Sequence, residues 1–289
     1  MVLQTLINGG YAGLQCAVMA LGFGLVHRTS RFMHFAHGAI FTVAAYSFLL
    51  VTNSLHLGVW TATGVALCSA LAVALSLEGA VYRPLRRANA SSLMLLLASF
   101  GAYALIQGGI AIAFGDEARS LSGRGVEVGR LVLGARVTTV QVIVMVSCLV
   151  SIGGVLGLLR LAGVGRQMRA LAADPELALI AGIRVDVLHM FAISLATLLA
   201  VVAGVAATFD VDLVPTMGFK VVLAAVTAAI IGRRSEHWGP VAGGLVLGTL
   251  QSTVGALGFS RWQDTVVFCV LICWMLIRPE PAVVLLGGR

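Results

Sequence analysis

The stretch LINGGYAGLQCAVMALGFGLV, residues 6–26, decides the fold because it runs for 21 residues without a charged side chain. A helix of that length crosses a hydrocarbon core about 30 Å thick. The whole chain has the same character, since 59% of its 289 residues are hydrophobic and only 11% are charged. Soluble domains carry about 25% charged residues. The composition therefore predicts an integral membrane protein.

Apolar windows like this one recur along the chain. Lipid offers no hydrogen-bond partner to the backbone, so spans are helices or closed barrels, and these continuous runs lack the alternation of barrel strands. We expect an all-α, polytopic membrane bundle of eight to nine segments. Three short windows are candidates for tilted, half-crossing or broken segments, namely 38–52, 219–231 and 264–277. The full set of windows is 3–26, 38–52, 57–78, 92–114, 137–159, 187–208, 219–231, 241–258 and 264–277.

Basic side chains follow the first window directly, in RTSRFMHFAHGAI at 28–40. Basic residues concentrate in cytoplasmic loops. If the amino terminus faces outward, thirteen of the 19 lysines and arginines fall on the inner side, so we expect 28–40 to face the cytoplasm. The net charge of +7 then reports orientation, and no partner nucleic acid is expected because no basic cluster is interleaved with aromatic residues. The thirteen are Arg28, Arg31, Arg83, Arg86, Arg87, Arg160, Arg166, Arg169, Arg184, Arg233, Arg234, Arg278 and Arg289.

Motifs for catalysis and cofactor binding are missing from the sequence. Lys220 is the only lysine, so there is no phosphate-binding loop, and there is no nucleophile–base motif of a hydrolase. His34 and His37 lack further nearby ligands, so we expect no metal and no cofactor in this chain. No enzyme activity is expected of this chain. Acidic residues lie at span edges, which disfavours proton or sodium coupling, and no charged binding group is found within the spans. They are Glu78, Asp186, Asp210, Asp212 and Asp264.

Polar side chains form a stripe on each of two windows. At 100° per residue, those of the first window lie within about 40° of one another, and the fourth window repeats the arrangement. Either the stripes bind helix to helix, or they line a path for a polar or zwitterionic solute. The stripes are Gln4, Asn8, Tyr11, Gln15 and Gly22, then Ser92, Ser99, Tyr103 and Gln107. The candidate path residues among them are Asn8, Tyr11, Gln15, Ser99, Tyr103 and Gln107.

A short bounded helix is predicted within GRQMRALAADPELALIAGIRVD, residues 165–186. Asp174 suits an N-cap, Pro175 the first helical position, and Glu176 the positive helix end. Gly182 can end the helix in a left-handed turn. The helix either lies on the membrane surface or binds in a groove of a partner protein.

Seven segments follow one another along the chain: residues 6–26, FAHGAI at 35–40, VYRPLRR at 81–87, residues 165–186, PTMGFK at 215–220, GPVAGGLVLGTLQS at 239–252 and RPE at 278–280. Together, in this order, they resemble the permease subunits of branched-chain amino-acid type ABC importers over almost the whole chain. His37 and Gly38 lie in the second segment, FAHGAI. There are two departures. The family usually has Asn where this chain has His34, and a glycine-rich turn where this chain has GRRSEHWGP at 232–240. That charged replacement is expected to alter contacts at the inner gate or with the ATPase.

The resemblance implies a single permease domain, 1–289, with a cytoplasmic coupling segment at 165–183. It implies a multi-pass protein of a bacterial-type inner membrane, paired with a second permease subunit, either a different one or a copy of itself. Two cytoplasmic ATP-binding subunits, which hold ATP and Mg, and an external solute-binding protein complete the importer. The residues expected to couple to the ATPase are Arg166, Arg169, Asp174, Pro175, Glu176 and Gly182.

The function expected from the resemblance is import of a small amino-acid-like solute. Branched-chain or other hydrophobic amino acids come first, and urea, amides or small carboxylates are the other candidates. The alternative is a stand-alone channel or secondary carrier for a small polar solute, in which 165–186 would be only a surface loop.

Overall fold

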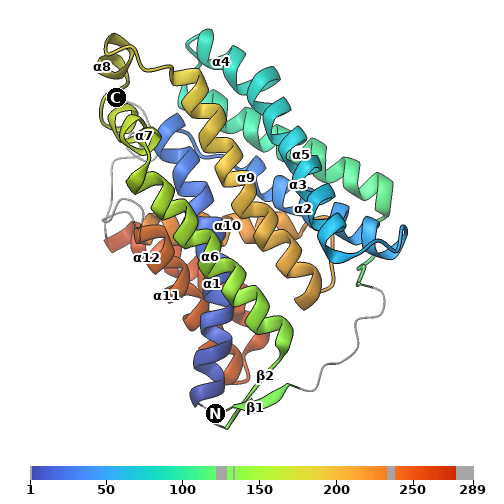
Figure 1. Cartoon of the computed structure of the whole chain (residues 1–289). Coiled ribbons are helices and arrows are strands. Elements are labelled where there is room, and N and C mark those ends of the chain that lie inside the picture. Colours follow the sequence, from blue (N-terminus) through green and yellow to red (C-terminus); the bar gives the residue numbers. More distant parts are fainter. Residues whose placement is uncertain (1, 122–128, 133, 233–237, 278–289) are drawn as a thin grey trace.

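The structure is a bundle of helices with a short β-hairpin at one end (Figure 1). It is a computed structural model that describes residues 2–121, 129–132, 134–232 and 238–277. The elements are α1 (Val2–Ser30), α2 (Ala36–Asn53), α3 (Val59–Leu77), the π-helical segment η1 (Glu78–Tyr82), α4 (Arg83–Arg87), α5 (Ser92–Phe114), β1 (Arg130–Val132), β2 (Ala135–Val137), α6 (Thr139–Leu161), α7 (Gly163–Ala173), α8 (Pro175–Ile180), α9 (Val185–Asp210), α10 (Met217–Ile231), α11 (Trp238–Ala256), the 3-10 segment η2 (Ser260–Trp262) and α12 (Gln263–Ile277).

The helices confirm the predicted all-α membrane bundle. Within the described residues, seven are long and apolar enough to cross a bilayer. α10 is short, with 15 residues, as its window predicted. α2 has 18 residues, so it is longer than the window 38–52 and long enough to be a candidate span. The last window is also longer than expected, since η2 and α12 form a continuous helical stretch of 18 residues.

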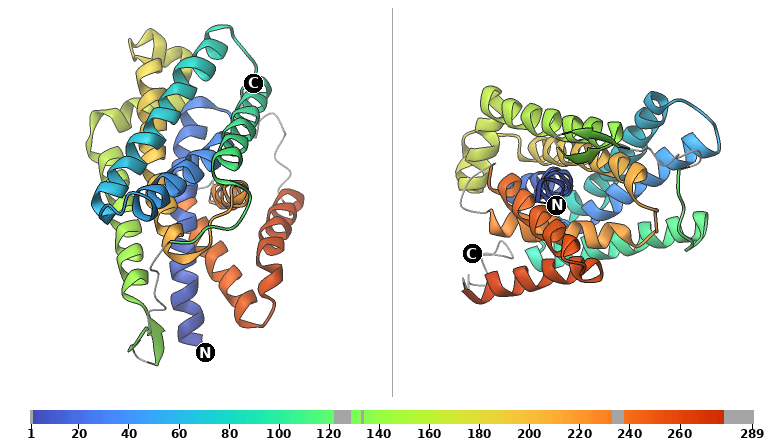
Figure 2. Two further views of the ribbon diagram at one scale, coloured as in Figure 1. Left: turned by 90° about the vertical axis from the view of Figure 1, so that its right-hand side faces the viewer. Right: turned by 90° about the horizontal axis from the view of Figure 1, so that it is seen from below.

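α1 runs through the middle of the bundle and packs against α11, α9 and α10. In its most apolar window 78% of residues are buried, against 6% in the last span. Glycines bring α1 and α11 into close contact: a methyl group at Gly9 would lie 2.9 Å from Thr249 Cα, and one at Gly13 would lie 2.9 Å from Leu245 Cα. α12 stands at one side of the bundle (Figure 2), so its exposed apolar face is available to lipid or another subunit.

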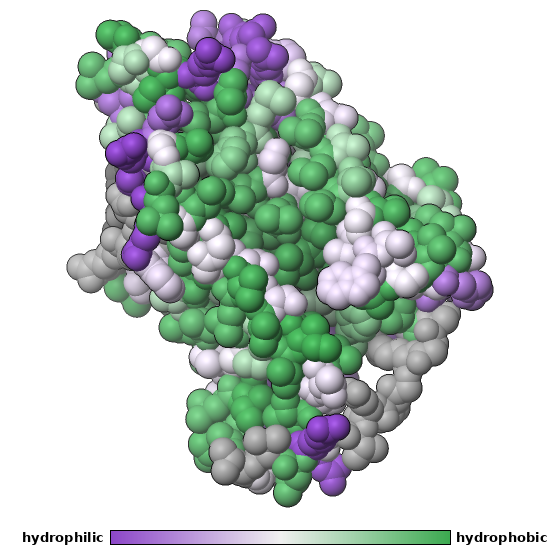
Figure 3. Space-filling view, in the orientation of Figure 1, coloured by the Kyte–Doolittle hydropathy of each residue, from purple (hydrophilic) through white to green (hydrophobic). Residues whose placement is uncertain are grey.

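The two ends of the bundle differ in character. α4, α7 and α8 lie at one end, and the start of α1 and the β1–β2 hairpin lie at the other (Figure 1). On the face shown in Figure 3, hydrophilic side chains gather at the α4, α7 and α8 end, above a largely hydrophobic middle. Gln4 fixes the hairpin to α1, because its side chain accepts a bond from Arg136 N at 2.8 Å and donates to Arg136 O at 3.1 Å.

An elbow at residues 31–35 joins α1 to α2. α1 continues to Ser30, and the backbone turns at Arg31 with φ of 54°. His27 Nδ1 lies 3.1 Å from the Phe32 carbonyl oxygen. His189 Nε2, from α9, lies 3.0 Å from the Thr29 carbonyl oxygen. The basic stretch of the sequence therefore forms a tightly bonded turn at the α7 end of the bundle.

Candidate translocation cavity

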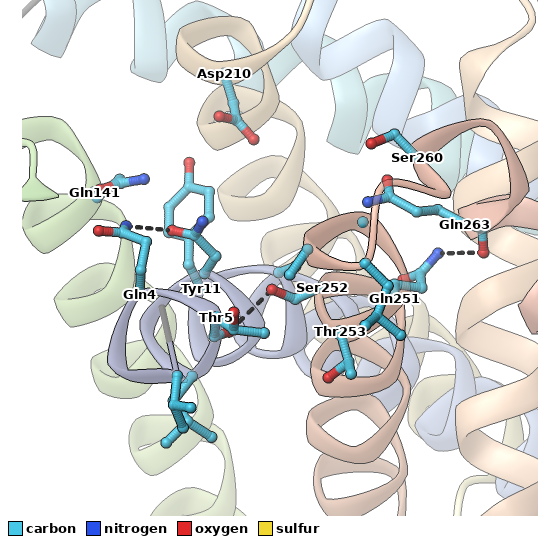
Figure 4. Close-up of a pocket in the computed structure, with 17 residues that line it drawn as sticks. Gln4, Thr5, Tyr11, Gln141, Asp210, Gln251, Ser252, Thr253, Ser260 and Gln263 are labelled. Carbon is cyan, nitrogen blue, oxygen red and sulfur yellow. Dashed lines mark hydrogen bonds between the residues drawn. The ribbon is translucent and has the colours of Figure 1, made fainter. Parts of the chain in front are cut away.

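A cavity of about 900 Å³ opens at the end of the bundle that carries the start of α1 (Figure 4). Residues from α1, α6, α9, α11, η2 and α12 form its wall. Its polar lining residues are Gln4, Thr5, Asn8, Tyr11, Gln141, Asp210, Gln251, Ser252, Thr253, Ser260 and Gln263.

Hydrogen bonds fix part of this lining. Gln4 Nε2 donates to Asn8 Oδ1 at 3.1 Å, and Ser252 Oγ donates to the Thr5 carbonyl at 2.9 Å. The Tyr11 hydroxyl and the Asp210 carboxylate point toward one another (Figure 4). The wall therefore offers both donors and acceptors to a polar solute.

A second cavity, of about 240 Å³, shares Ala12, Asp210 and Gln251 with the first. Gln15 lines it, and the Gln15 side-chain nitrogen is buried without a hydrogen-bond partner among the described residues. The two cavities together follow the α1 stripe from Asn8 to Gln15. Buried polar groups normally have a partner, so Gln15 marks a place where a polar ligand would gain a contact.

Charged side chains reach the second cavity from three elements: Asp210 from the end of α9, Lys220 from α10 and Asp264 from α12. Lys220 Nζ donates to Asp264 Oδ2 at 2.8 Å. Sequence reasoning missed this cluster, and the expectation that no charged group marks the path does not hold for this cavity. The only signal was that each charge lies at the edge of an apolar window.

The α5 stripe does not line either of these cavities. Ser99 Oγ accepts a bond from Ala36 N at 3.0 Å, and Tyr103 Oη donates to the Thr216 carbonyl at 3.5 Å. Gln107 is half-buried. The structure thus separates the predicted path residues into an α1 group that shares the cavities and an α5 group that packs against other segments. A path role for the second group stays a prediction.

His37 and Gly38 lie inside the bundle. His37 is fully buried, and a methyl group at Gly22 would lie 3.0 Å from its Nε2 and 3.2 Å from the Ala196 carbonyl oxygen. The His37 ring therefore packs where α1, α2 and α9 meet. A methyl group at Gly38 would overlap the Gly218 carbonyl oxygen, so both glycines permit the close contact of α2 with α10.

His34, the departure from the expected Asn, joins the elbow to two other elements. Its Nδ1 lies 3.2 Å from the Tyr82 hydroxyl and 3.4 Å from Ser99 Oγ. The ring is buried. His34 therefore links the elbow to η1 and α5, which is a packing role in this structure.

The segment predicted to couple to an ATPase contains the expected bounded helix, α8. Asp174 Oδ1 accepts bonds from Glu176 N at 3.0 Å and Leu177 N at 3.2 Å, and Pro175 begins the helix. Gly182 has φ of +79°. Ile180 is 83% exposed, so α8 presents an apolar side chain outward.

The residues before α8 form a further helix, α7, which the sequence did not indicate. Arg169 donates to the Leu159 carbonyl at 3.2 Å, and Arg166 is exposed. The charged turn at 232–240 lies mostly outside the described residues. Trp238 belongs to the described part of this turn. The guanidinium carbon of Arg160 lies over the Trp238 ring, 5.7 Å from the centroid of that ring.

These features define a class: a multi-pass membrane protein with two cavities along α1, the larger of which opens at one end of the bundle, and a short capped helix at the other end. The chain belongs to the family described as "Branched-chain amino acid transport system / permease component", which matches residues 5–275. It is therefore a membrane permease component of a transport system.

Individual relatives extend over nearly the whole chain. The high-affinity branched-chain amino acid transport system permease protein LivH of Escherichia coli (strain K12) is 27% identical over 292 residues, covering 96% of this chain and 94% of LivH. The corresponding protein BraD of Pseudomonas aeruginosa is 26% identical over 290 residues, with the same coverage. The solved structure of PsaBC from Streptococcus pneumoniae in complex with Fab has a TM-score of 0.51 and 16% identity, covering 93% of this chain and 89% of that chain. That likeness concerns the fold alone.

Proposed function

We propose that this chain is the membrane-spanning subunit of an ATP-driven importer, and that it carries a small amino-acid-like solute across a bacterial-type inner membrane. Branched-chain and other hydrophobic amino acids are the first candidates, in keeping with the transport systems named for LivH and BraD. The observation that carries the proposal is the pair of cavities along α1, both with polar side chains in their walls, the larger of which opens at the end of the bundle opposite α8.

The energy enters from other subunits. α7 and α8, with Arg166, Arg169 and the capping residues Asp174 and Gly182, dock on a cytoplasmic ATP-binding subunit that holds ATP and Mg. The exposed Leu177, Leu179 and Ile180 support this docking, because they give α8 an apolar face at the polar end of the bundle. Closure of the ATPase pair moves α8 and reorients the spans around the cavities, which is alternating access.

Two further partners complete the proposed importer. A second permease subunit, a different chain in the leading version and a copy of this one in the other, covers exposed apolar faces such as that of α12. An external solute-binding protein delivers the solute to the open end of the larger cavity.

Co-purification and reconstitution test the proposal. We expect an importer to form a stable complex with ATP-binding subunits, and to take up solute into liposomes only when that complex, the external binding protein and ATP are all present. The purified chain alone serves as the control. Solute flux through that control without an ATP-hydrolysing partner would instead establish a stand-alone channel or secondary carrier.

A further inference from the structure

The Lys220–Asp264 pair is unusual for its position. Lys220 is the only lysine of the chain and lies in the first turn of α10. The pair is highly exposed, with side chains 71% and 57% accessible. Charges in membrane proteins face water or protein and not lipid. Exposed ion pairs add little to stability, so its presence calls for another role.

The surroundings of the pair suit one kind of solute. Lys220 and Asp264 line the smaller cavity together with Gln15 and Asp210, and its remaining wall includes the apolar side chains of Met19, Phe41 and Met217. One part of the wall is therefore charged and polar, and another is hydrophobic. A hydrophobic amino acid has the same two parts, a zwitterionic head and an apolar side chain.

We propose that Lys220 binds the carboxylate of the transported amino acid, which takes the place of the Asp264 carboxylate in the ion pair. The exchange replaces one carboxylate by another, so the Lys220 ammonium stays paired throughout. The positive end of α10 adds attraction for the incoming anion. Asp210 and the Gln15 amide, which line the same cavity, face the rest of the polar head.

This inference rests on the proposed function and deepens it by assigning a specificity-determining residue. The Lys220–Asp264 pair could have one of two roles. In the first, the ion pair only holds α10 to α12, and the complex works equally well when the positive and negative residues exchange places. In the second, the ammonium must be on α10, where it meets the solute.

The test uses the reconstituted importer complex in liposomes, with leucine as the probe and a leucine-loaded binding protein outside. Leucine uptake per ATP hydrolysed is compared for the wild type, Lys220→Gln, Lys220→Arg and the charge exchange Lys220→Asp with Asp264→Lys. Arg261→Gln is the matched control, because Arg261 is an exposed cation in η2 that does not line either cavity.

We expect Lys220→Gln to lower uptake per ATP roughly tenfold or more, because one charge-assisted hydrogen bond to the solute is lost. The complex should still assemble and hydrolyse ATP. Lys220→Arg retains part of the uptake, Arg261→Gln retains all of it, and the charge exchange does not restore it. Normal uptake by Lys220→Gln, or restored uptake in the charge exchange, would overturn the assignment.

If the complex with Lys220→Gln does not assemble, the assembly and uptake of the charge-exchange variant distinguish the two roles of the ion pair. Restored assembly without uptake supports a carboxylate-binding lysine, and restored uptake leaves the pair a structural contact. The proposed function has a separate readout in the wild-type complex. ATP-dependent uptake by the wild type upholds it whatever the variants do, and its failure there would count against the importer itself.

Discussion

The guanidinium of Arg31 donates to the carbonyl oxygen of Ala172 at 3.0 Å, joining the end of α1 to the end of α7. The same group lies 3.3 Å from the Ala173 carbonyl. These carbonyls belong to the last turn of α7, which carries partial negative charge. Arg31 therefore connects α7, which is proposed to move with the ATP-binding subunit, to α1, which lines both cavities.

Arg31→Gln is expected to uncouple transport from hydrolysis. The variant loses a cation held on two helix-end carbonyls, a contact of about 1.5–3 kcal/mol. Uptake per ATP should fall severalfold, while complex yield and ATPase rate stay near wild type. Arg31→Lys keeps a cation able to reach one carbonyl, so its uptake per ATP should lie between the values for the wild type and Arg31→Gln. Equal losses of uptake and ATPase activity in Arg31→Gln would show that Arg31 serves assembly only.

Asp174→Ala is expected to weaken the complex with the ATP-binding subunit. The side chain satisfies two backbone donors at the start of α8, and loss of an N-cap costs about 1 kcal/mol of helix stability. The recovery of ATPase subunit after affinity purification measures the effect. Asp174→Asn keeps a capping oxygen and should retain the complex; an equally large loss there would point to the charge and not to the cap.

Gly182→Val is expected to act on the other end of α8. The residue has φ of +79°, which costs a β-branched side chain about 1–2 kcal/mol or more. The same co-purification should show reduced ATPase recovery, and Gly182→Asn, which tolerates this conformation better, should be milder. Full recovery of the ATPase subunit with Gly182→Val would show that this turn is not needed for docking.

Gly38→Ala is expected to destabilise the permease itself. The added methyl group would overlap the Gly218 carbonyl, forcing α2 and α10 apart at a cost of about 1–3 kcal/mol or more. Thermal unfolding in detergent measures the change. Gly64→Ala in α3 is the matched control because its added methyl group has open space around it. Unchanged unfolding of Gly38→Ala would contradict the close helix contact.

Asn8→Leu is expected to lower uptake about fivefold without preventing assembly, the effect of one lost hydrogen bond of about 1 kcal/mol. Asn8 lines the larger cavity, whereas Gln107 does not line either cavity. Gln107→Leu should therefore have the smaller effect on uptake per complex. The reverse order would move the path toward α5, and lost assembly with normal uptake per complex would favour helix-to-helix binding.

Local patterns predicted much of this fold. Continuous apolar windows gave the spans, and Asp174, Pro175 and Gly182 bounded α8, because caps depend on residues close in sequence. α7 was missed since its start contains Gly163 and Gly165, which disfavour helices in isolation. A methyl group at Gly165 would overlap the Leu159 carbonyl, so packing explains a glycine that no local rule requires.

The cavity was only half predictable for a similar reason. Asn8, Tyr11 and Gln15 recur at helical spacing and could be found in the sequence as one face. Lys220 and Asp264 belong to separate helices, α10 and α12, and only the packing of these helices brings the charges together. The position of His37 at a helix start does not reveal that α1 and α9 cover it, and only the packing of these helices shows this.

Photo-crosslinking from position 180 tests the central claim most directly. Ile180 is 83% exposed on α8, and we propose that this helix receives energy from an ATP-hydrolysing partner in the cytoplasm. A photoreactive amino acid at position 180 in cells that express the whole importer should yield a covalent adduct with the ATP-binding subunit. An adduct with the external binding protein, or modification of position 180 by a membrane-impermeant reagent outside intact cells, would contradict the account.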